Sequence, residues 1–322
     1  MKATLQDLEL AAQTLAPHMA PTPQYRWPLL SAELGVDLVV KHENHTPTGA
    51  FKVRGGLNFL ARRLERGPLS GLISATRGNH GQSLAYACRA AGIPCTIVVP
   101  QGNSVEKNQA MRAFGADLIE AGEDFDAAKA HAADVASELG LEFAPSFAPE
   151  LIAGVGTYAL ELFRNEPELD TVYVPIGLGS GICGLISARD ALGLKTKIVG
   201  VVSDQALSYK LSFEMGNVVT TNSAHTFADG VAVREADPNA LEIILQGADR
   251  IIAVSDDQIA DAIRILYRTT HSVAEGAGAV PLAGVIAEKQ QMQAKSVGVI
   301  LCGQNIDTPK FAAVLNGKTP AP

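Results

Sequence analysis

The lysine at position 52 lies in a sequence context that can make an amine nucleophilic. Thr48-Gly49-Ala50-Phe51 precedes Lys52, and a helical pattern begins directly after it. Desolvation beside an aromatic ring and the positive end of a helix dipole both lower the pKa of a lysine. The neutral amine can then attack a carbonyl carbon. The alternative interpretation is a solvated lysine at a helix start, which is the commoner case because perturbed lysines are rare.

A second segment, Thr76-Arg77-Gly78-Asn79-His80, follows an apolar run at 71–75 and opens a helical pattern. Free N–H groups at a helix start, together with hydroxyl, amide and imidazole side chains, can bind a carboxylate. The same residues also suit a capped strand-to-helix turn in which Thr76 or Asn79 is only the cap. Both interpretations stay open from the residues alone.

A third segment, Gly177-Leu178-Gly179-Ser180-Gly181, lies between an apolar run and another helical pattern. Closely spaced glycines let successive N–H groups converge on a phosphate at the positive end of the helix. Residues 179–184 also satisfy G-x-G-x-x-G, and Asp204 lies about 20 residues further on, so a nicotinamide oxidoreductase is an alternative. Glycines that serve only a tight turn and helix packing are a third interpretation.

The cysteines favour a protein with reduced thiols and no zinc. Cys302 ends the apolar run 296–301, where a lone cysteine is usually a small core residue. The other cysteines, at positions 88, 95 and 183, are far from it and form no C-x-x-C pair. No Cys/His group has the spacing of zinc ligands.

The elements that must position these residues follow an α/β rhythm. Short apolar, β-branched runs occur at 37–41, 71–75, 94–100, 116–121, 171–177, 196–202, 250–254 and 296–303. Helical patterns separate them at 83–91, 105–114, 124–139, 151–163, 182–192 and 256–267. This alternation predicts parallel sheets flanked by helices, with ligands bound beyond the carboxyl ends of the strands.

Length and charge limit the classes of function. The 322 residues predict two lobes at roughly 100–200 residues per domain. The net charge of -8 offers no basic surface for nucleic acid, and no run is long and apolar enough to span a membrane. The first 18 residues carry acids instead of a secretory signal core. We therefore expect a cytoplasmic protein whose partner is a small molecule.

Taken together, these segments resemble the fold type II (β-family) pyridoxal-phosphate enzymes, in particular the threonine/serine dehydratase and serine racemase group. The resemblance runs from Pro21 to about Asp307, with each motif in the family's order. It implies a two-lobed α/β fold like that of the tryptophan synthase β chain, and a homodimer or larger homo-oligomer. Residues 1–51 and 147–322 would form the large cofactor-binding domain, and 52–146 the small substrate-side domain.

The resemblance also implies roles for single residues. Lys52 would bind pyridoxal 5'-phosphate covalently, Phe51 would pack near its ring and Asn79 would hydrogen-bond the ring hydroxyl. Cys302 would face the ring nitrogen. The phosphate would be bound by residues Gly177, Leu178, Gly179, Ser180 and Gly181. The substrate would be bound by residues Thr76, Arg77, Gly78 and His80. Segments 152–157, 226–230 and 275–278 look like family segments that line the cleft.

The function implied is that of a dehydratase, an ammonia-lyase that converts a 3-hydroxy amino acid of the L-threonine or L-serine type to a 2-oxo acid and ammonia. The released amine of Lys52 would remove the Cα proton, and loss of the β-hydroxyl would give an aminoacrylate. A neutral thiol at Cys302 would leave the ring nitrogen unprotonated, which disfavours transamination. An amino-acid racemase or β-replacement enzyme is the nearest alternative.

Three departures from the family refine this expectation. Arg77 stands where the racemases carry an acid/base serine; because arginine is a poor proton shuttle, racemisation is disfavoured. Arg77 either binds a second substrate carboxylate, as in a hydroxyaspartate, or points away from the cleft and pairs with an acid of the protein. Ala144 replaces a histidine and is expected to widen the cleft, as for a phenylserine. Val202 and Ser208 replace carboxylates of a metal site, so no divalent metal is expected there.

Overall fold

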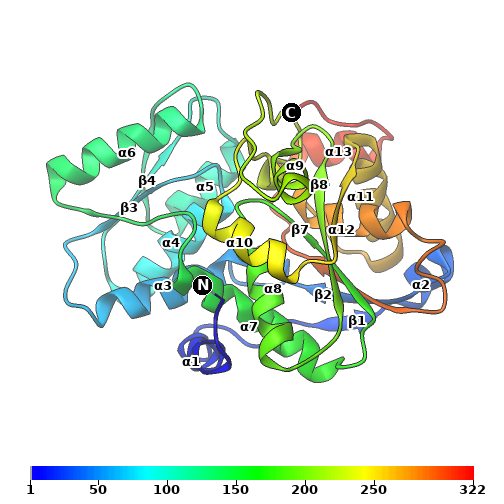
Figure 1. Ribbon diagram of the computed structural model, residues 1–322. Coiled ribbons are helices and arrows are strands. Elements are labelled where there is room, and N and C mark those ends of the chain that lie inside the picture. The colour runs from blue at the N-terminus through cyan, green and yellow to red at the C-terminus, as the bar shows by residue number, and fades with distance from the viewer. Residues whose placement is uncertain (1) are drawn as a thin grey trace.

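The computed structural model describes residues 2–322 and contains two separate β-sheets. The six-stranded sheet has the order β1 (Gln24–Arg26), β2 (Asp37–His42), β10 (Ser296–Leu301), β7 (Thr171–Pro175), β8 (Lys197–Ser203) and β9 (Arg250–Val254). All neighbours in it are parallel except β1, which pairs antiparallel with β2 at the edge. Its inner strands are continuous apolar runs because helices cover both faces (Figure 1).

The four-stranded sheet has the order β5 (Asp117–Glu120), β4 (Cys95–Val99), β3 (Leu72–Ala75) and β6 (Glu142–Phe143), and all its pairs are parallel. In Figure 1 it forms the cyan part of the molecule, beside the larger lobe. The sheet lies wholly within residues 52–146. We use "four-stranded lobe" for that range and "six-stranded lobe" for the rest, and the domain boundaries themselves stay a proposal.

Fourteen helical segments connect the strands of residues 2–322. They are α1 (Leu5–Leu15), α2 (Pro28–Leu34), α3 (Lys52–Leu64), α4 (Asn79–Ala91), α5 (Val105–Ala113), α6 (Phe125–Leu139), α7 (Pro149–Asn165), α8 (Ser180–Ala191), α9 (Ser208–Met215), the 3-10 turn η1 (Asp229–Val231), α10 (Pro238–Gly247), α11 (Asp256–Thr270), α12 (Gly276–Ala287) and α13 (Thr308–Leu315).

The predicted α/β fold with parallel sheets is confirmed, and the differences have local causes. Helices α4 and α8 begin at Asn79 and Ser180, ahead of the expected starts at 83 and 182. Glycines in their first turns weaken the helical pattern of the sequence, so the starts were predicted too late. The three-residue β1 and two-residue β6 are too short to leave a pattern in the sequence. Among residues 2–322, no helix combines the length and apolarity needed to cross a membrane.

Helix α3 connects the two lobes through close helix packing. A Cβ atom on Gly154 of α7 would lie 2.4 Å from the carbonyl oxygen of Arg54 in α3. On the other side of α3, a Cβ atom on Gly56 would lie 2.2 Å from Ser83 Oγ of α4. Because any larger side chain would separate these helices, the glycines keep the first turns of α3, where Lys52 lies, against both neighbours.

Candidate active site

The chemically promising segments meet at one cleft between the lobes. Lys52, Asn79 and Ser180 are the first residues of α3, α4 and α8, and Cys302 directly follows β10. The cleft has a volume of about 1480 Å³. Its lining includes every residue that the sequence analysis assigned to cofactor or substrate, namely Phe51, Lys52, Thr76, Arg77, Gly78, Asn79, His80, Gly177, Leu178, Gly179, Ser180, Gly181 and Cys302.

The amine of Lys52 is shielded from water and weakly partnered. Its Nζ donates a hydrogen bond to Ser180 Oγ at 2.9 Å and lies 5.0 Å from the centroid of the Phe51 ring. Desolvation lowers the pKa of Lys52 from 10.5 to about 8. A lysine of this kind has a substantial neutral fraction near neutral pH, so it can act as a nucleophile or as a base.

The loop from Gly177 to Gly181 leads into the N-terminus of α8 and needs two of its glycines for structural reasons. A Cβ atom on Gly177 would lie 2.3 Å from the carbonyl oxygen of Gly230. Gly179 has φ +101°, a conformation that favours glycine. At Gly181, by contrast, a Cβ atom would make only ordinary van der Waals contacts, with the Phe51 ring at 3.5 Å and the Tyr158 hydroxyl oxygen at 3.9 Å. No side chain of residues 2–322 caps the start of α8, so its first N–H groups are free to bind a phosphate.

Cys302 is buried, and its thiol stays neutral. Desolvation, with the nearby Glu275 carboxylate, raises the pKa of Cys302 well above its usual value. The thiol therefore carries no charge that would hold a proton on a neighbouring ring nitrogen. A neutral thiol is what the family resemblance implies for Cys302, and its place at the ring nitrogen stays a prediction.

The turn from Thr76 to His80 is held from within and by Lys107. Thr76 Oγ1 accepts a hydrogen bond from the Gly78 N–H at 3.0 Å, and a Cβ atom on Gly78 would lie 2.5 Å from Lys107 Cδ. No side chain caps α4, so the simple capping interpretation was wrong. Burial, reinforced by the Lys52 charge, lowers the pKa of His80 to about 3. Its Nε2 is buried without a hydrogen-bond partner among residues 2–322.

A group of charged and amide side chains around Asn79 was not predicted. Asn79 Nδ2 donates to Glu275 Oε1 at 2.6 Å, and Asn305 Nδ2 donates to Asn79 Oδ1 at 2.8 Å. Lys107 Nζ lies 2.6 Å from Asp229 Oδ2 and 3.4 Å from Glu275 Oε2. Asp229 and Glu275 lie in segments that were predicted to line the cleft, but nothing in the sequence pointed to Lys107 or Asn305.

Arg77 is exposed at the cleft and has no hydrogen bond or ion pair with any of residues 2–322. Arg234, which also lines the cleft, pairs with Asp124 and Asp126. Of the two interpretations of Arg77, pairing with an acid of the protein is therefore wrong for this structure. The guanidinium is available to an anion in the cleft.

Two expectations about the cleft wall are wrong. Ala144 is fully buried in the core of the four-stranded lobe, where its carbonyl accepts from Ser74 Oγ at 2.8 Å, and it does not widen the cleft. Residues 152–157 lie within α7 and also do not line the cleft. Their glycines serve helix packing, since a Cβ atom on Gly156 would lie 3.3 Å from the carbonyl oxygen of Gly184 in α8.

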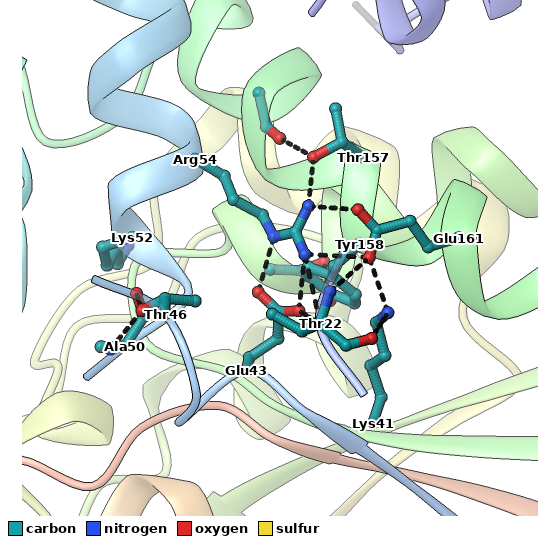
Figure 2. A network of polar contacts seen from close by, with 12 residues as sticks. Thr22, Lys41, Glu43, Thr46, Ala50, Lys52, Arg54, Thr157, Tyr158 and Glu161 are labelled. Atoms are coloured by element: carbon teal, nitrogen blue, oxygen red, sulfur yellow. Dashed lines mark hydrogen bonds and ion pairs between the residues drawn. The ribbon is translucent and has the colours of Figure 1, made fainter. Parts of the chain in front are cut away.

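Behind Lys52, a buried ion network surrounds Arg54 (Figure 2). Arg54 Nε and Nη2 donate to Glu43 at 2.7 and 3.0 Å, and Nη1 donates to Glu161 at 2.7 Å. Lys41 Nζ donates to Glu161 at 2.6 Å. Figure 2 shows the guanidinium between carboxylates that come from two directions, with Lys52 on the same helix. The network ties the first turn of α3 to β2 and α7.

The pKa shifts in this network follow its charges. Burial lowers the pKa of Arg54, but Glu43 and Glu161 more than compensate, so the pKa is raised overall. Burial raises the pKa of Glu161, and the Arg54 and Lys41 charges reverse this to a net lowering. The network thus sets two basic side chains, Lys41 and Arg54, against the carboxyl groups of Glu43 and Glu161.

Comparison with known proteins agrees with this geometry. The model of the family described as "Pyridoxal-phosphate dependent enzyme" matches residues 15–303. The chain belongs to this family. Its cofactor is pyridoxal phosphate, as the sequence predicted, and the nicotinamide alternative is set aside. Asp204, on which that alternative depended, is exposed and does not line the cleft.

Relatives with several activities resemble this enzyme. An L-threonine ammonia-lyase of Thermotoga maritima is 34% identical over 97% of this chain and 78% of its own. An L-threo-3-hydroxyaspartate ammonia-lyase of Saccharomyces cerevisiae is 30% identical over 99% of this chain and 98% of its own. Among solved structures, maize serine racemase superposes with a TM-score of 0.92 at 27% identity, covering 98% of each chain.

The residues of the cleft fit pyridoxal phosphate. The open N-terminus of α8 beyond Gly181 suits the phosphate, the amine of Lys52 suits covalent attachment, and the neutral Cys302 suits an unprotonated ring nitrogen. When bound, the cofactor supplies a carbonyl carbon for an amine and an electron-withdrawing ring that stabilises negative charge. Asn79 lines the same cleft and has an amide N–H left for a ring oxygen.

Proposed function

We propose that this enzyme is an ammonia-lyase that converts a 3-hydroxy amino acid of the L-threonine or L-serine type to a 2-oxo acid and ammonia. The observation that carries the proposal is the amine of Lys52, whose pKa is lowered to about 8 and which lies in the cleft beside the glycine loop. The relatives named L-threonine ammonia-lyase support the type of reaction.

In this proposal, separate groups of the protein bind the cofactor, bind the substrate and accept the proton. Lys52 holds the cofactor and, once its amine is released, accepts the proton from the substrate Cα, for which a lowered pKa is suited. The N–H groups at the start of α4, after Gly78, and the side chains of Thr76 and His80 bind the substrate carboxylate. The loop from Gly177 to Gly181 holds the phosphate.

Elimination is favoured over racemisation because of the residue that stands at position 77 of the cleft. Racemisation needs a second acid/base on the opposite face of Cα, and Arg77 stands at the place of the racemase serine. An arginine stays protonated and does not exchange protons at neutral pH. A racemase is therefore the alternative that we do not favour, although serine racemases share the fold.

The test of the proposed function is a substrate panel on the purified holoenzyme. L-serine, L-threonine, threo-3-hydroxyaspartate and phenylserine are assayed for oxo acid and ammonia, and the remaining amino acid is analysed for its enantiomers. We expect oxo acid and ammonia in equal amounts and no opposite enantiomer. Recovery of the opposite enantiomer without oxo acid would show a racemase. The structure gives no reason to expect activity on phenylserine, because Ala144 does not line the cleft and so does not widen it.

A second candidate function, specificity for a hydroxyaspartate, is favoured by the unpaired Arg77. A guanidinium binds a carboxylate through two parallel hydrogen bonds, and this cleft-lining arginine has no partner among residues 2–322. Arg77→Ala is expected to lower kcat/KM for 3-hydroxyaspartate about 30-fold while leaving L-threonine nearly unchanged. Arg234→Ala is the matched control, since Arg234 lines the cleft but is already paired with Asp126. Equal losses for both substrates would exclude this specificity.

We also propose a cytoplasmic homo-oligomer with no nucleic-acid partner. The net charge of -8 supports the last point, since nucleic-acid binding needs clustered positive charge. The oligomeric state rests on the family resemblance, and light scattering on the eluted holoenzyme measures it directly.

A further inference from the structure

A chain of hydrogen bonds passes through Asn79. It begins at the backbone carbonyl of Thr48, which accepts from Asn305 Nδ2 at 2.8 Å. The same Nδ2 group donates to Asn79 Oδ1 at 2.8 Å. Asn79 Nδ2 then donates to Glu275 Oε1 at 2.6 Å. Two carboxamides are thus connected in series between a backbone carbonyl and a carboxylate.

The two ends of this chain fix its direction. A backbone carbonyl oxygen can only accept, so the amide group of Asn305 must face Thr48. At the other end, Glu275 Oε2 lies 3.4 Å from Lys107 Nζ, and an ammonium group can only donate. Burial raises the pKa of Glu275, and the Lys107 charge opposes this rise and favours the carboxylate, which accepts from Asn79. The assignment of oxygen and nitrogen in both carboxamides follows from these ends.

The opposite orientation of Asn79 is disfavoured at both contacts. A half-turn of its carboxamide would place Oδ1 against the Glu275 carboxylate and Nδ2 against the amide hydrogens of Asn305. The contact with Glu275 would then join two acceptors and the contact with Asn305 two donors. Both hydrogen bonds would be lost in a half-buried site. In the observed orientation, the second hydrogen of Asn79 Nδ2 has no acceptor among residues 2–322.

We propose that Glu275 and Asn305 are positioning residues that hold this second N–H of Asn79 toward the ring hydroxyl of pyridoxal phosphate. The proposal rests on the assignment of Asn79 to the cofactor ring. It adds that neither flanking residue touches the reacting atoms, yet both decide whether a donor or an acceptor faces the ring oxygen. Cofactor retention and the visible spectrum of the holoenzyme therefore depend on all three residues.

The chain crosses the boundary between the lobes. Asn79 and Lys107 belong to the four-stranded lobe, whereas Glu275 and Asn305 belong to the six-stranded lobe. Asp229, also from the six-stranded lobe, holds Lys107 Nζ at 2.6 Å. The donor at Asn79 is consequently oriented by contacts from the opposite lobe, so the ring-binding group is complete only when the lobes are together.

The experiment uses the holoenzyme with Asn305→Asp. Aspartate has the shape of asparagine but cannot donate, so it faces Thr48 and Asn79 with an accepting oxygen and favours the reversed Asn79 amide. Asn316→Asp is the matched control, because Asn316 is an exposed asparagine at the end of α13. The readouts are the pH dependence of the visible band and the rate of cofactor loss on dialysis. Asn79→Ala gives the signature of a missing donor.

We expect Asn305→Asp to lose the cofactor about tenfold faster than the wild type and to shift the pH midpoint of the band in the same direction as Asn79→Ala. Asn316→Asp should match the wild type. Glu275→Gln removes the fixed acceptor at the other end and should shift the band the same way, which covers the case that Asn305→Asp does not fold.

Two results would overturn the proposal. Wild-type spectra for both flanking variants, with an altered Asn79→Ala, would show that Asn79 binds the ring without being positioned. A wild-type spectrum for Asn79→Ala itself would show that Asn79 is not at the ring. In either case, oxo-acid formation by the wild type still decides the lyase function separately.

Discussion

The buried network around Arg54 gives a sharp prediction for Glu43→Gln. Arg54 donates to the Glu43 carboxylate through Nε and Nη2, and Thr22 Oγ1 donates to it as well. Glutamine has the same shape, but its amide nitrogen must face one of these donors. The substitution removes one negative charge from a network with two positive and two negative groups, so a net positive charge stays buried.

The magnitude follows from what is lost. One hydrogen bond to a charged group contributes about 1.5–3 kcal/mol, and breaking a buried ion pair by removing one partner costs about 3–5 kcal/mol. Because Glu161 still pairs with Arg54 at 2.7 Å, we expect the lower end, about 3 kcal/mol. For a protein of this size that corresponds to a decrease in Tm of roughly 4–5 °C.

Urea and thermal denaturation of the holoenzyme measure this effect, with Glu9→Gln as control. Glu9 pairs with Arg164 at the surface, where both side chains are more than one-third exposed, so its loss is expected to cost less than about 1 kcal/mol. If Glu43→Gln unfolds within about 2 °C of the control, the network does not stabilise the protein as an ion network, and our reasoning about its buried charges is wrong.

Further predictions concern the cofactor site. Lys52→Ala should abolish oxo-acid formation but leave the circular dichroism spectrum unchanged, because the side chain makes only one hydrogen bond within residues 2–322, to Ser180; residual turnover would refute the mechanism. Gly177→Ala should destabilise the protein, since its Cβ would meet the Gly230 carbonyl at 2.3 Å, whereas Gly181→Ala should fold normally and bind the cofactor more weakly. Equal melting temperatures would contradict this. Since the pKa of Lys52 is about 8 when folded and 10.5 when unfolded, the unfolded chain binds more protons in that interval. The stability of the cofactor-free protein should therefore rise with pH from about 8 to 10.5, by at most about 3 kcal/mol, and urea denaturation of Lys52→Met should lack this rise.

The parts of the site that could be predicted from sequence are those encoded locally. The context of Lys52 and the glycines from 177 to 181 are short segments at strand-to-helix transitions, where backbone geometry alone limits what the residues can do. The parallel sheets were predictable for a similar reason, because each buried strand is a continuous apolar run.

The polar networks could not be predicted because their members are far apart in the chain. Arg54 and Glu161 are 107 positions apart, and Lys107 and Glu275 are 168 apart. No pattern of spacing connects such residues before the fold is known. Ala144 failed for a different reason: a smaller side chain was taken to enlarge the cleft, but its backbone lies in the core of the four-stranded lobe.

The polar contacts between the lobes differ in burial, and this ranks them by how easily they separate. Arg234 and Asp126 at the cleft are 45% and 65% exposed, and such pairs contribute about 0–1 kcal/mol. Lys107 and Asp229 are intermediate, at 8% and 29%. Arg54 and Glu43 are 2% and 0% exposed, and breaking that pair is far more costly. Any separation of the lobes must therefore begin at the exposed pair of Arg234 and Asp126. The first turn of α3, which carries Lys52, stays fixed to the six-stranded lobe through Arg54.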